Sequence, residues 1–228
     1  MVKRLLPSFL LVIIAFGAFA QSSGFISDNV TGNPYRPASR PDVVGSPLLF
    51  SDWMPGVIYL KDGHKADKFP LNFDLFNNEV LFQHQGNSLV VVDAVKEVVI
   101  FPYGANANVS YVFRNGFLPV EKNNESTFYQ VMQDGPTTLL KLTKKIITEK
   151  AEYNQPVVKS FESSETYYVV RANKAPQKIS KSKKALLEAL ADSSGKLASW
   201  IEKNGYKCKS DEELVAVVKA FNENQHLQ

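Results

Sequence analysis

Apolar and polar residues alternate most regularly along residues 68–93, where two short polar breaks divide the pattern into three parts. Two-residue turns at 77–78 and at 86–87 would fold this stretch into three antiparallel strands. Both turns independently place Phe73 and Phe82 on one apolar face. A slip of one residue would turn that face outward, so the pattern strongly specifies the buried side. The stretch therefore predicts a β-meander at the centre of the fold.

The predicted meander has two different faces. Its apolar face pairs Leu75 with Val80, Phe73 with Phe82, Leu71 with His84, Phe82 with Val91 and His84 with Leu89. Its other face carries Asn72, Asp74, Glu79 and Gln83, together with Leu81, Val90 and Val92. We expect Phe73→Asp to abolish folding, because it would bury a charge. We expect Asp74→Ala, on the more polar face, to be nearly neutral.

Further short runs of strand-like residues surround the meander. They cover residues 57–60, 95–101, 109–113, 127–132, 137–142, 157–161 and 166–171. Asp134-Gly135 indicates a tight hairpin, and the strand after it can continue through Ile147. The last two runs predict a final hairpin of their own. The total of about nine to eleven strands favours an antiparallel sheet that curls or closes.

The apolar period changes from 2 to 3.6 after Arg171. Helices are predicted over 183–191 and 196–203, and Gly205 is well placed to end the second. Ser210 begins a capping box for a third helix. The apolar stripe of that helix is Leu214, Val217, Val218 and Phe221. Because such short helices are marginal alone, we expect a three-helix cluster that touches the β-body.

These patterns predict an α+β protein with a mainly antiparallel meander, curled or barrel-like, and a small C-terminal helical cluster. The expected boundaries are a signal peptide over 1–20, an irregular proline-rich leader over 21–52, an antiparallel β domain over 53–172 and a helical region over 173–228. A chain of 228 residues is long enough for a substantial core.

The first twenty residues have the pattern of an export signal. Lys3 and Arg4 precede an apolar run, and Ala18-Phe19-Ala20 provides a small-residue cleavage site. An uncleaved anchor is the alternative, but the run is shorter than the ~20 residues that span a bilayer. We therefore expect cleavage after Ala20 and a soluble, periplasmic or secreted product that begins at Gln21 and carries no lipid.

Charge and cysteine content exclude several partners. Without Lys3 and Arg4 the chain has 24 basic and 23 acidic residues, so electrostatics give no reason to expect a nucleic acid or an anionic membrane as partner. Cys208 is the one cysteine, so no internal disulfide can form. Although two lysines flank it, we interpret Cys208 as a small, half-buried apolar residue near a helix start.

Few residues suggest catalytic or metal chemistry. Asp62, His64 and Asp67 lie close enough in sequence to approach a cation, but turn formation explains Asp62-Gly63 fully and we predict no metal there. His84 is interpreted as an edge residue of the apolar face and His226 as part of a frayed end. No nucleophile elbow, zinc-binding helix, phosphate loop or dinucleotide fingerprint is present. We therefore assign no catalytic, cofactor-binding or metal-binding residue and expect no cofactor.

Other polar features have simpler explanations. The carboxylates Asp74, Glu79, Glu97 and Glu125 are dispersed and cannot be paired from sequence, so a glycosidase-like site stays open. Glycosylation triplets at Asn29, Asn108 and Asn124 arise readily by chance. The lysine-rich run 141–150 alternates like a strand with one solvated side, which explains it better than a nucleic-acid patch does.

The order of elements resembles a group of uncharacterised exported β-rich proteins of Gram-negative bacteria. The similarity is carried by a strand ending at 60–63, then FPLNFDLFNNEVLF, FYQVMQDGPTTLLK and WIEKNGYKCKSDEELVAVVKAFN, and covers roughly 53–222. The resemblance implies an exported β-rich domain with a C-terminal helical tail. It transfers no catalytic residue.

Three functional hypotheses follow. The leading one is an exported, non-catalytic module that binds or scaffolds an unknown protein or envelope component, without nucleic acid and without a transmembrane segment after cleavage. The first alternative is a carrier that holds an apolar ligand or lipid in a curved sheet, suggested by the many phenylalanines. The second is a hydrolase that uses the dispersed carboxylates.

Overall fold

The computed structural model describes residues 25–27, 30–37, 42–103, 109–151, 156–172, 174–191 and 195–224. They form two mainly antiparallel sheets followed by three helices, which confirms the predicted α+β class. Both sheets are open rather than closed. The predicted signal peptide lies outside the described residues. No described helix combines the length and the apolar character needed to cross a membrane.

The first sheet has five strands and contains the meander. In spatial order its strands are β1 (Phe25–Ser27), β2 (Val30–Pro34), β8 (Asn87–Val91), β7 (Glu79–His84) and β6 (Leu71–Asp74). Two strands therefore come from the segment predicted to be an irregular leader. Gly32 explains why β2 can lie there, since a Cβ at this position would come within 2.6 Å of the Phe82 ring. The expectation that this segment is irregular is wrong for β1 and β2, and also for β3 (Val43–Val44), which joins the second sheet.

The second sheet has nine strands and runs through the whole molecule. Its spatial order is β14 (Gln177–Ile179), β13 (Val158–Arg171), β12 (Thr137–Lys150), β11 (Tyr129–Gln133), β10 (Tyr111–Arg114), β9 (Val95–Ile100), β4 (Gly56–Leu60) and β5 (Lys65–Ala66). The ninth strand, β3 (Val43–Val44), pairs in parallel with the outer part of β13.

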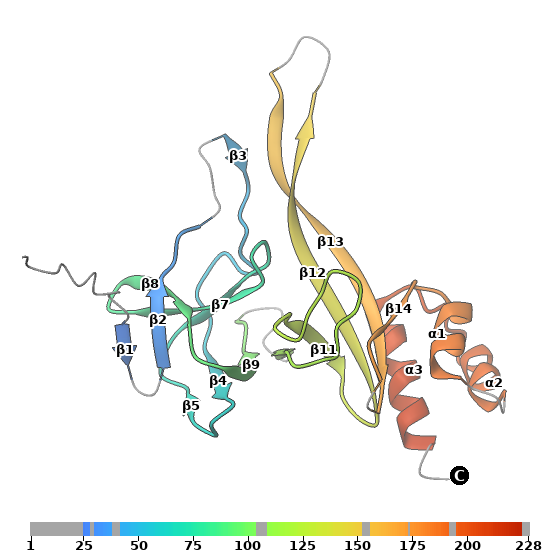
Figure 1. The fold of residues 1–228 in the computed structure, drawn as a ribbon. Coiled ribbons are helices and arrows are strands. Elements are labelled where there is room, and N and C mark those ends of the chain that lie inside the picture. Colours follow the sequence, from blue (N-terminus) through green and yellow to red (C-terminus); the bar gives the residue numbers. More distant parts are fainter. Residues whose placement is uncertain are drawn as a thin grey trace, which may run out of the picture.

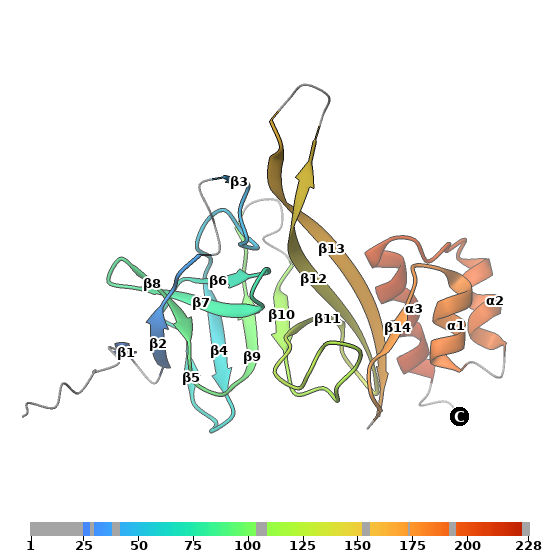
Figure 2. The same cartoon turned by 45° about the horizontal axis from the view of Figure 1, so that its top comes forward.

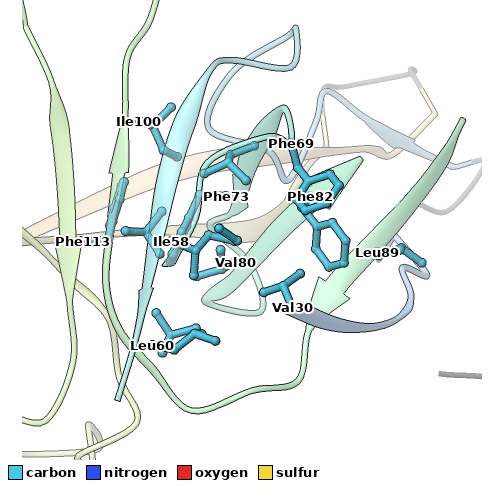
Figure 3. Close-up of a cluster of buried hydrophobic side chains, with 14 of the residues drawn as sticks. Val30, Ile58, Leu60, Phe69, Phe73, Val80, Phe82, Leu89, Ile100 and Phe113 are labelled. Atoms are coloured by element: carbon cyan, nitrogen blue, oxygen red, sulfur yellow. The ribbon is translucent and has the colours of Figure 1, made fainter. Parts of the chain in front are cut away.

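The meander packs face to face against β4, β9 and β10 of the second sheet. Figure 3 shows the apolar side chains of both sheets meeting in this core. Phe73 stacks on Phe113 with ring centroids 4.3 Å apart, and Phe69 lies against Phe82 at 5.5 Å. Phe73 and Phe82 are 1% and 0% exposed, so the predicted buried face is confirmed.

The pairing within the meander differs from the prediction by two residues. Phe73 lies opposite Val80 rather than Phe82, and Phe82 lies opposite Leu89 rather than Val91. A four-residue loop replaces the first predicted turn, because the Asp74 carboxylate accepts hydrogen bonds from the backbone N–H groups of the loop. An even shift keeps every side chain on its predicted face, so the core survives the error.

The face opposite this core is buried along β6, contrary to expectation. Asn72 and Asp74 are both 0% exposed. The segment 47–54 covers them, and the Asn72 side chain donates to the Phe50 carbonyl oxygen at 2.9 Å and accepts from the Phe50 N–H. The prediction that Asp74→Ala is neutral assumes a solvent-exposed side chain. That assumption is wrong, because the Asp74 carboxylate is buried and accepts hydrogen bonds.

The predicted hairpin around Asp134-Gly135 is confirmed, because β11 pairs antiparallel with β12. The predicted final hairpin over 157–171 is wrong, because residues 158–171 form the single strand β13. β12 and β13 pair without interruption from Thr137 with Arg171 to Lys150 with Val158. The serine-rich stretch 162–165, interpreted as a turn, is the solvated middle of β13. Its acidic ends are held by lysines of the neighbouring strand, as in the ion pair between Lys150 and Glu162 at 2.5 Å.

The outer part of this hairpin projects from the molecule. In Figures 1 and 2 it extends beyond the meander on one side and the helices on the other. We call residues 143–150 of β12 and 158–165 of β13 the arm. β3 lies along the edge of the arm formed by β13.

The three helices form the predicted cluster and pack on the base of the hairpin. α1 (Lys183–Leu190), α2 (Lys196–Lys203) and α3 (Asp211–Asn224) share a core with Leu139, Tyr167 and Val169. The Ser210 hydroxyl accepts from the Glu213 N–H at 3.2 Å, as the capping box predicts. Gly205 adopts a φ of +70° directly after Asn204, the C-cap of α2, as expected of a helix-ending glycine.

Candidate binding site

The turn that contains Asp62, His64 and Asp67 does not assemble a metal site. Asp62 accepts from the N–H of His64 at 2.9 Å, and its other oxygen lies 3.0 Å from His64 Nδ1, which lowers the pKa of Asp62. Asp67 instead pairs with Lys65 at 2.8 Å. All four side chains are exposed. Within the described ranges, no group of three or more His, Cys, Asp or Glu residues could hold a metal ion.

His84 and Cys208 both pack against apolar side chains. The His84 ring lies edge-on to Phe69 at 5.4 Å, at the end of β7 and opposite Asn87. Cys208 is 0% exposed within the helical core, more buried than predicted, and burial raises the pKa of its thiol. A raised thiol pKa is the opposite of what activates a cysteine nucleophile. His226 lies outside the described residues, as do Asn29 and Asn108.

The dispersed carboxylates do not form an accessible catalytic pair. Asp74 and Glu79 lie opposite each other, and burial together with the charge of Asp74 raises the pKa of Glu79. Asp74, however, is fully buried and accepts from two backbone N–H groups, from the Asn77 amide and from the Tyr35 hydroxyl at 2.8 Å. Its acceptor capacity is used by the fold. Glu97 is bound to Arg114 at 2.6 Å, and Glu125 is exposed.

The arm presents two faces with different surroundings, because side chains alternate along paired strands. Its odd-numbered face turns toward the meander, where Phe161 is 8% exposed and meets the Phe76 ring edge-on at 5.7 Å. The Lys145 N–H donates to the Leu75 carbonyl oxygen at 3.1 Å on the same side of the hairpin. These contacts cover the odd-numbered face around Phe161, whereas Glu149, Ser163 and Glu165 on the same face are exposed.

The even-numbered face of the arm is exposed and carries apolar residues from three strands. Ile146 on β12 is 46% exposed, Val158 on β13 is 50% exposed, and Val44 on β3 is 63% exposed. Val44 shares this face because it pairs with Ser160 in the parallel register. We call this surface, which also includes Thr148, the arm face. Glu162 and Lys150 lie on the same face, opposite Ile146 and Val158, and form an ion pair with each other. The arm face therefore combines exposed apolar side chains with one ion pair on an element that projects from the body.

A hollow of about 280 Å³ lies at the inner end of the arm face. Its lining is Glu121, Lys122, Asn123, Leu142, Lys144, Ser164, Thr166 and Tyr168. The Lys144 ammonium donates to Asn123 Oδ1 at 2.9 Å, and the Asn123 amide donates to the Tyr168 hydroxyl at 3.3 Å. Burial, and after it the negative charge of Glu121, raises the pKa of Tyr168. In the hollow, Asn123 therefore links the Lys144 ammonium to the buried phenol of Tyr168.

A polar network on the opposite face fastens the base of the arm to α3. Asp211 contacts Lys181 at 2.7 Å, Lys141 at 2.9 Å and the Tyr167 hydroxyl at 2.7 Å. Burial opposes ionisation of Asp211, but these hydrogen bonds outweigh it and lower its pKa to about 2. The Lys181 ammonium also lies 4.6 Å from the centre of the Tyr167 ring. The network makes the base of the arm a rigid support.

Sequence patterns missed this site, although one signal was present. Alternation along β12 puts Lys144 and Lys145 on opposite faces, and the run was interpreted only as a solvated edge. Nothing in the sequence brings Asn123 next to Lys144, because they approach through the fold of the second sheet. Comparisons with family models, with curated proteins and with solved structures found no match for this chain.

Proposed function

We propose that this protein is an exported, non-catalytic binding module and that the arm face is the surface that contacts its partner, a protein of the cell envelope. The observation that carries the proposal is that each of three strands exposes an apolar side chain on the arm face, around the ion pair between Lys150 and Glu162. Exposed apolar patches on projecting elements are typical of interaction sites. The rigid base of the arm supports the same role, because it limits the entropy lost on binding.

The carrier hypothesis has less support than this proposal. Stacked and edge-on phenylalanine rings fill the space between the two sheets, where a curved-sheet carrier would hold its ligand. The hydrolase hypothesis is also weaker, because Asp74 is buried and occupied by four donors. Export itself is supported only by the sequence pattern of residues 1–20.

Site-specific photocrosslinking in the producing cell tests the proposal. A photoreactive residue at Ile146 or at Val158 should give one discrete crosslinked protein. The matched control is Val92, which is 53% exposed but lies on the meander. Crosslinking from position 92 as efficient as from 146, or no adduct from either arm position, would exclude the arm face as the contact surface. N-terminal sequencing of the exported protein should begin at Gln21, and an intact Met1 would contradict export by cleavage.

A further inference from the structure

Lys144, like its neighbour Lys145, forms no ion pair with a carboxylate in the described part of the chain, whereas five lysines around the hairpin do. Those that pair with a carboxylate are Lys141, Lys150, Lys159, Lys178 and Lys181. In the described part of the chain no carboxylate forms an ion pair with Lys144, which is held by the neutral amide oxygen of Asn123. A partly buried ammonium whose hydrogen-bond acceptor is neutral has no negative charge beside it to compensate its own. The hollow beside it therefore favours a negative charge.

We infer that the hollow at the inner end of the arm face binds the carboxylate of an acidic side chain of the partner protein. The inference deepens the proposed function and rests on it, since the hollow and the apolar residues belong to one continuous face. Lys144 supplies the fixed positive charge, and Ser164 and Thr166 supply hydroxyl donors from the facing strand. An ionised carboxylate accepts hydrogen bonds only, which matches this set of donors.

The charge of the lining agrees with this assignment. Lys122 and Lys144 are its two cations, and Glu121 is its one carboxylate. Glu121 pairs with Lys178 at 3.2 Å and also raises the pKa of Tyr168 in the hollow, so the two cations of the lining exceed its one carboxylate by a single positive charge. The volume of about 280 Å³ suits the end of a side chain better than a larger ligand.

The position of the hollow also predicts the spacing of the partner sequence. Lys144 and Ile146 point to the same side of β12, and residues two apart on a strand are roughly 7 Å apart. An extended partner segment has the same repeat. We therefore expect an acidic residue in the hollow and an apolar residue two positions away on Ile146, with a further apolar contact toward Val44 and Val158.

Nuclear magnetic resonance of the full mature chain tests the hollow directly. Acetate should shift the backbone amides of Lys144, Ser164 and Thr166 in a saturable way, while chloride at the same ionic strength should not. A synthetic peptide, acetyl-Asp-Thr-Leu-Thr-Val-amide, should shift these amides and also that of Ile146. If acetate causes no saturable shift, the inference is wrong. If inorganic phosphate causes saturable shifts and acetate does not, the hollow binds a phosphate group rather than a carboxylate. That result would also overturn the inference.

The adjacent lysines provide a matched pair of variants. Lys144→Gln should weaken peptide binding about tenfold, the loss expected for one charge-assisted hydrogen bond. Lys145→Gln removes the same charge from the opposite face and should leave the affinity unchanged. Ser164→Ala, at an exposed position, serves as a second variant if Lys144→Gln unfolds the hairpin. Equal losses in Lys144→Gln and Lys145→Gln would reduce the effect to nonspecific attraction and end the inference.

The two proposals can fail separately. If acetate shifts the amides but neither Ile146 nor Val158 gives a crosslink, the hollow binds an anion and the arm face is not the contact surface. Crosslinks from these positions that are as strong in Lys144→Gln as in the unaltered chain would retain the docking role and remove the carboxylate contact.

Discussion

The two halves of the β12–β13 hairpin belong to the same strands but have different surroundings. Near the base, Leu139 and Tyr167 face the helical core, while Leu140 and Tyr168 face a second apolar cluster. Along the arm, Phe161 is covered, but Ile146 on the other face is exposed. A strand that is buried on both sides contributes to stability, whereas one that is open on a single side can contribute to recognition. The hairpin therefore joins a structural half to a binding half.

The largest expected effect is a core truncation in the structural half. Leu140→Ala removes a side chain that is 0% exposed and should lower the free energy of unfolding by roughly 2–5 kcal/mol. Denaturant unfolding measures this. The control Ile146→Ala, six residues along the same strand face, should cost less than about 1 kcal/mol. Similar losses for the two variants would mean that the arm face is buried in the native protein.

The contrast between buried and open faces applies to carboxylates too. Asp74→Ala leaves two backbone N–H groups, the Asn77 amide and the Tyr35 hydroxyl without their acceptor, so we expect a loss of roughly 2–4 kcal/mol in thermal or denaturant unfolding. Glu149→Ala, at an exposed position on the arm, is the matched control and should be almost neutral. A neutral Asp74→Ala would contradict the buried role of this carboxylate.

The Asp211 network that supports the base of the arm should have an intermediate effect. Asp211→Asn weakens three contacts at once and should cost about 1–3 kcal/mol at neutral pH. The folded pKa of Asp211 lies below its ordinary value of 3.8, at about 2. Its contribution is therefore fully present above pH 3.8 and is lost as the pH falls toward 2.

The pH dependence separates this network from general destabilisation. The difference in melting temperature between the unaltered chain and Asp211→Asn should shrink as the pH falls from neutral toward 2. A difference that stays constant over this interval would show that ionisation of Asp211 contributes nothing to stability.

The smallest expected effect on stability lies on the arm face itself. The double variant Ile146→Ser, Val158→Ser replaces exposed apolar side chains and should change the free energy of unfolding by less than about 1 kcal/mol. It should nevertheless reduce crosslinking from a photoreactive residue at Val44, because the apolar contact area is lost. Undiminished crosslinking would show that the apolar side chains of the arm face do not contribute to binding.

Local patterns were sufficient to predict the buried meander face and the three helices. Phe73 and Phe82 are buried as expected, and α2 begins and ends at its predicted residues, because apolar periodicity depends on neighbouring residues. The pairing of the meander was wrong by two residues, because the Asp74 side chain selects the loop length. The alternating pattern alone cannot distinguish registers that differ by an even number.

Contacts between distant segments decided the rest. Segment 47–54 buries Asn72 and Asp74, and Asn123 positions Lys144 from 21 residues away. The sequence by itself determined which side chains favour burial and where the helices begin. Both depend on the local spacing of apolar residues and on local hydrogen bonds. Only the tertiary structure decided that the base of the hairpin is buried on both faces, whereas the arm is covered only around Phe161. That difference depends on what packs against each face, which the alternation within the strands does not encode.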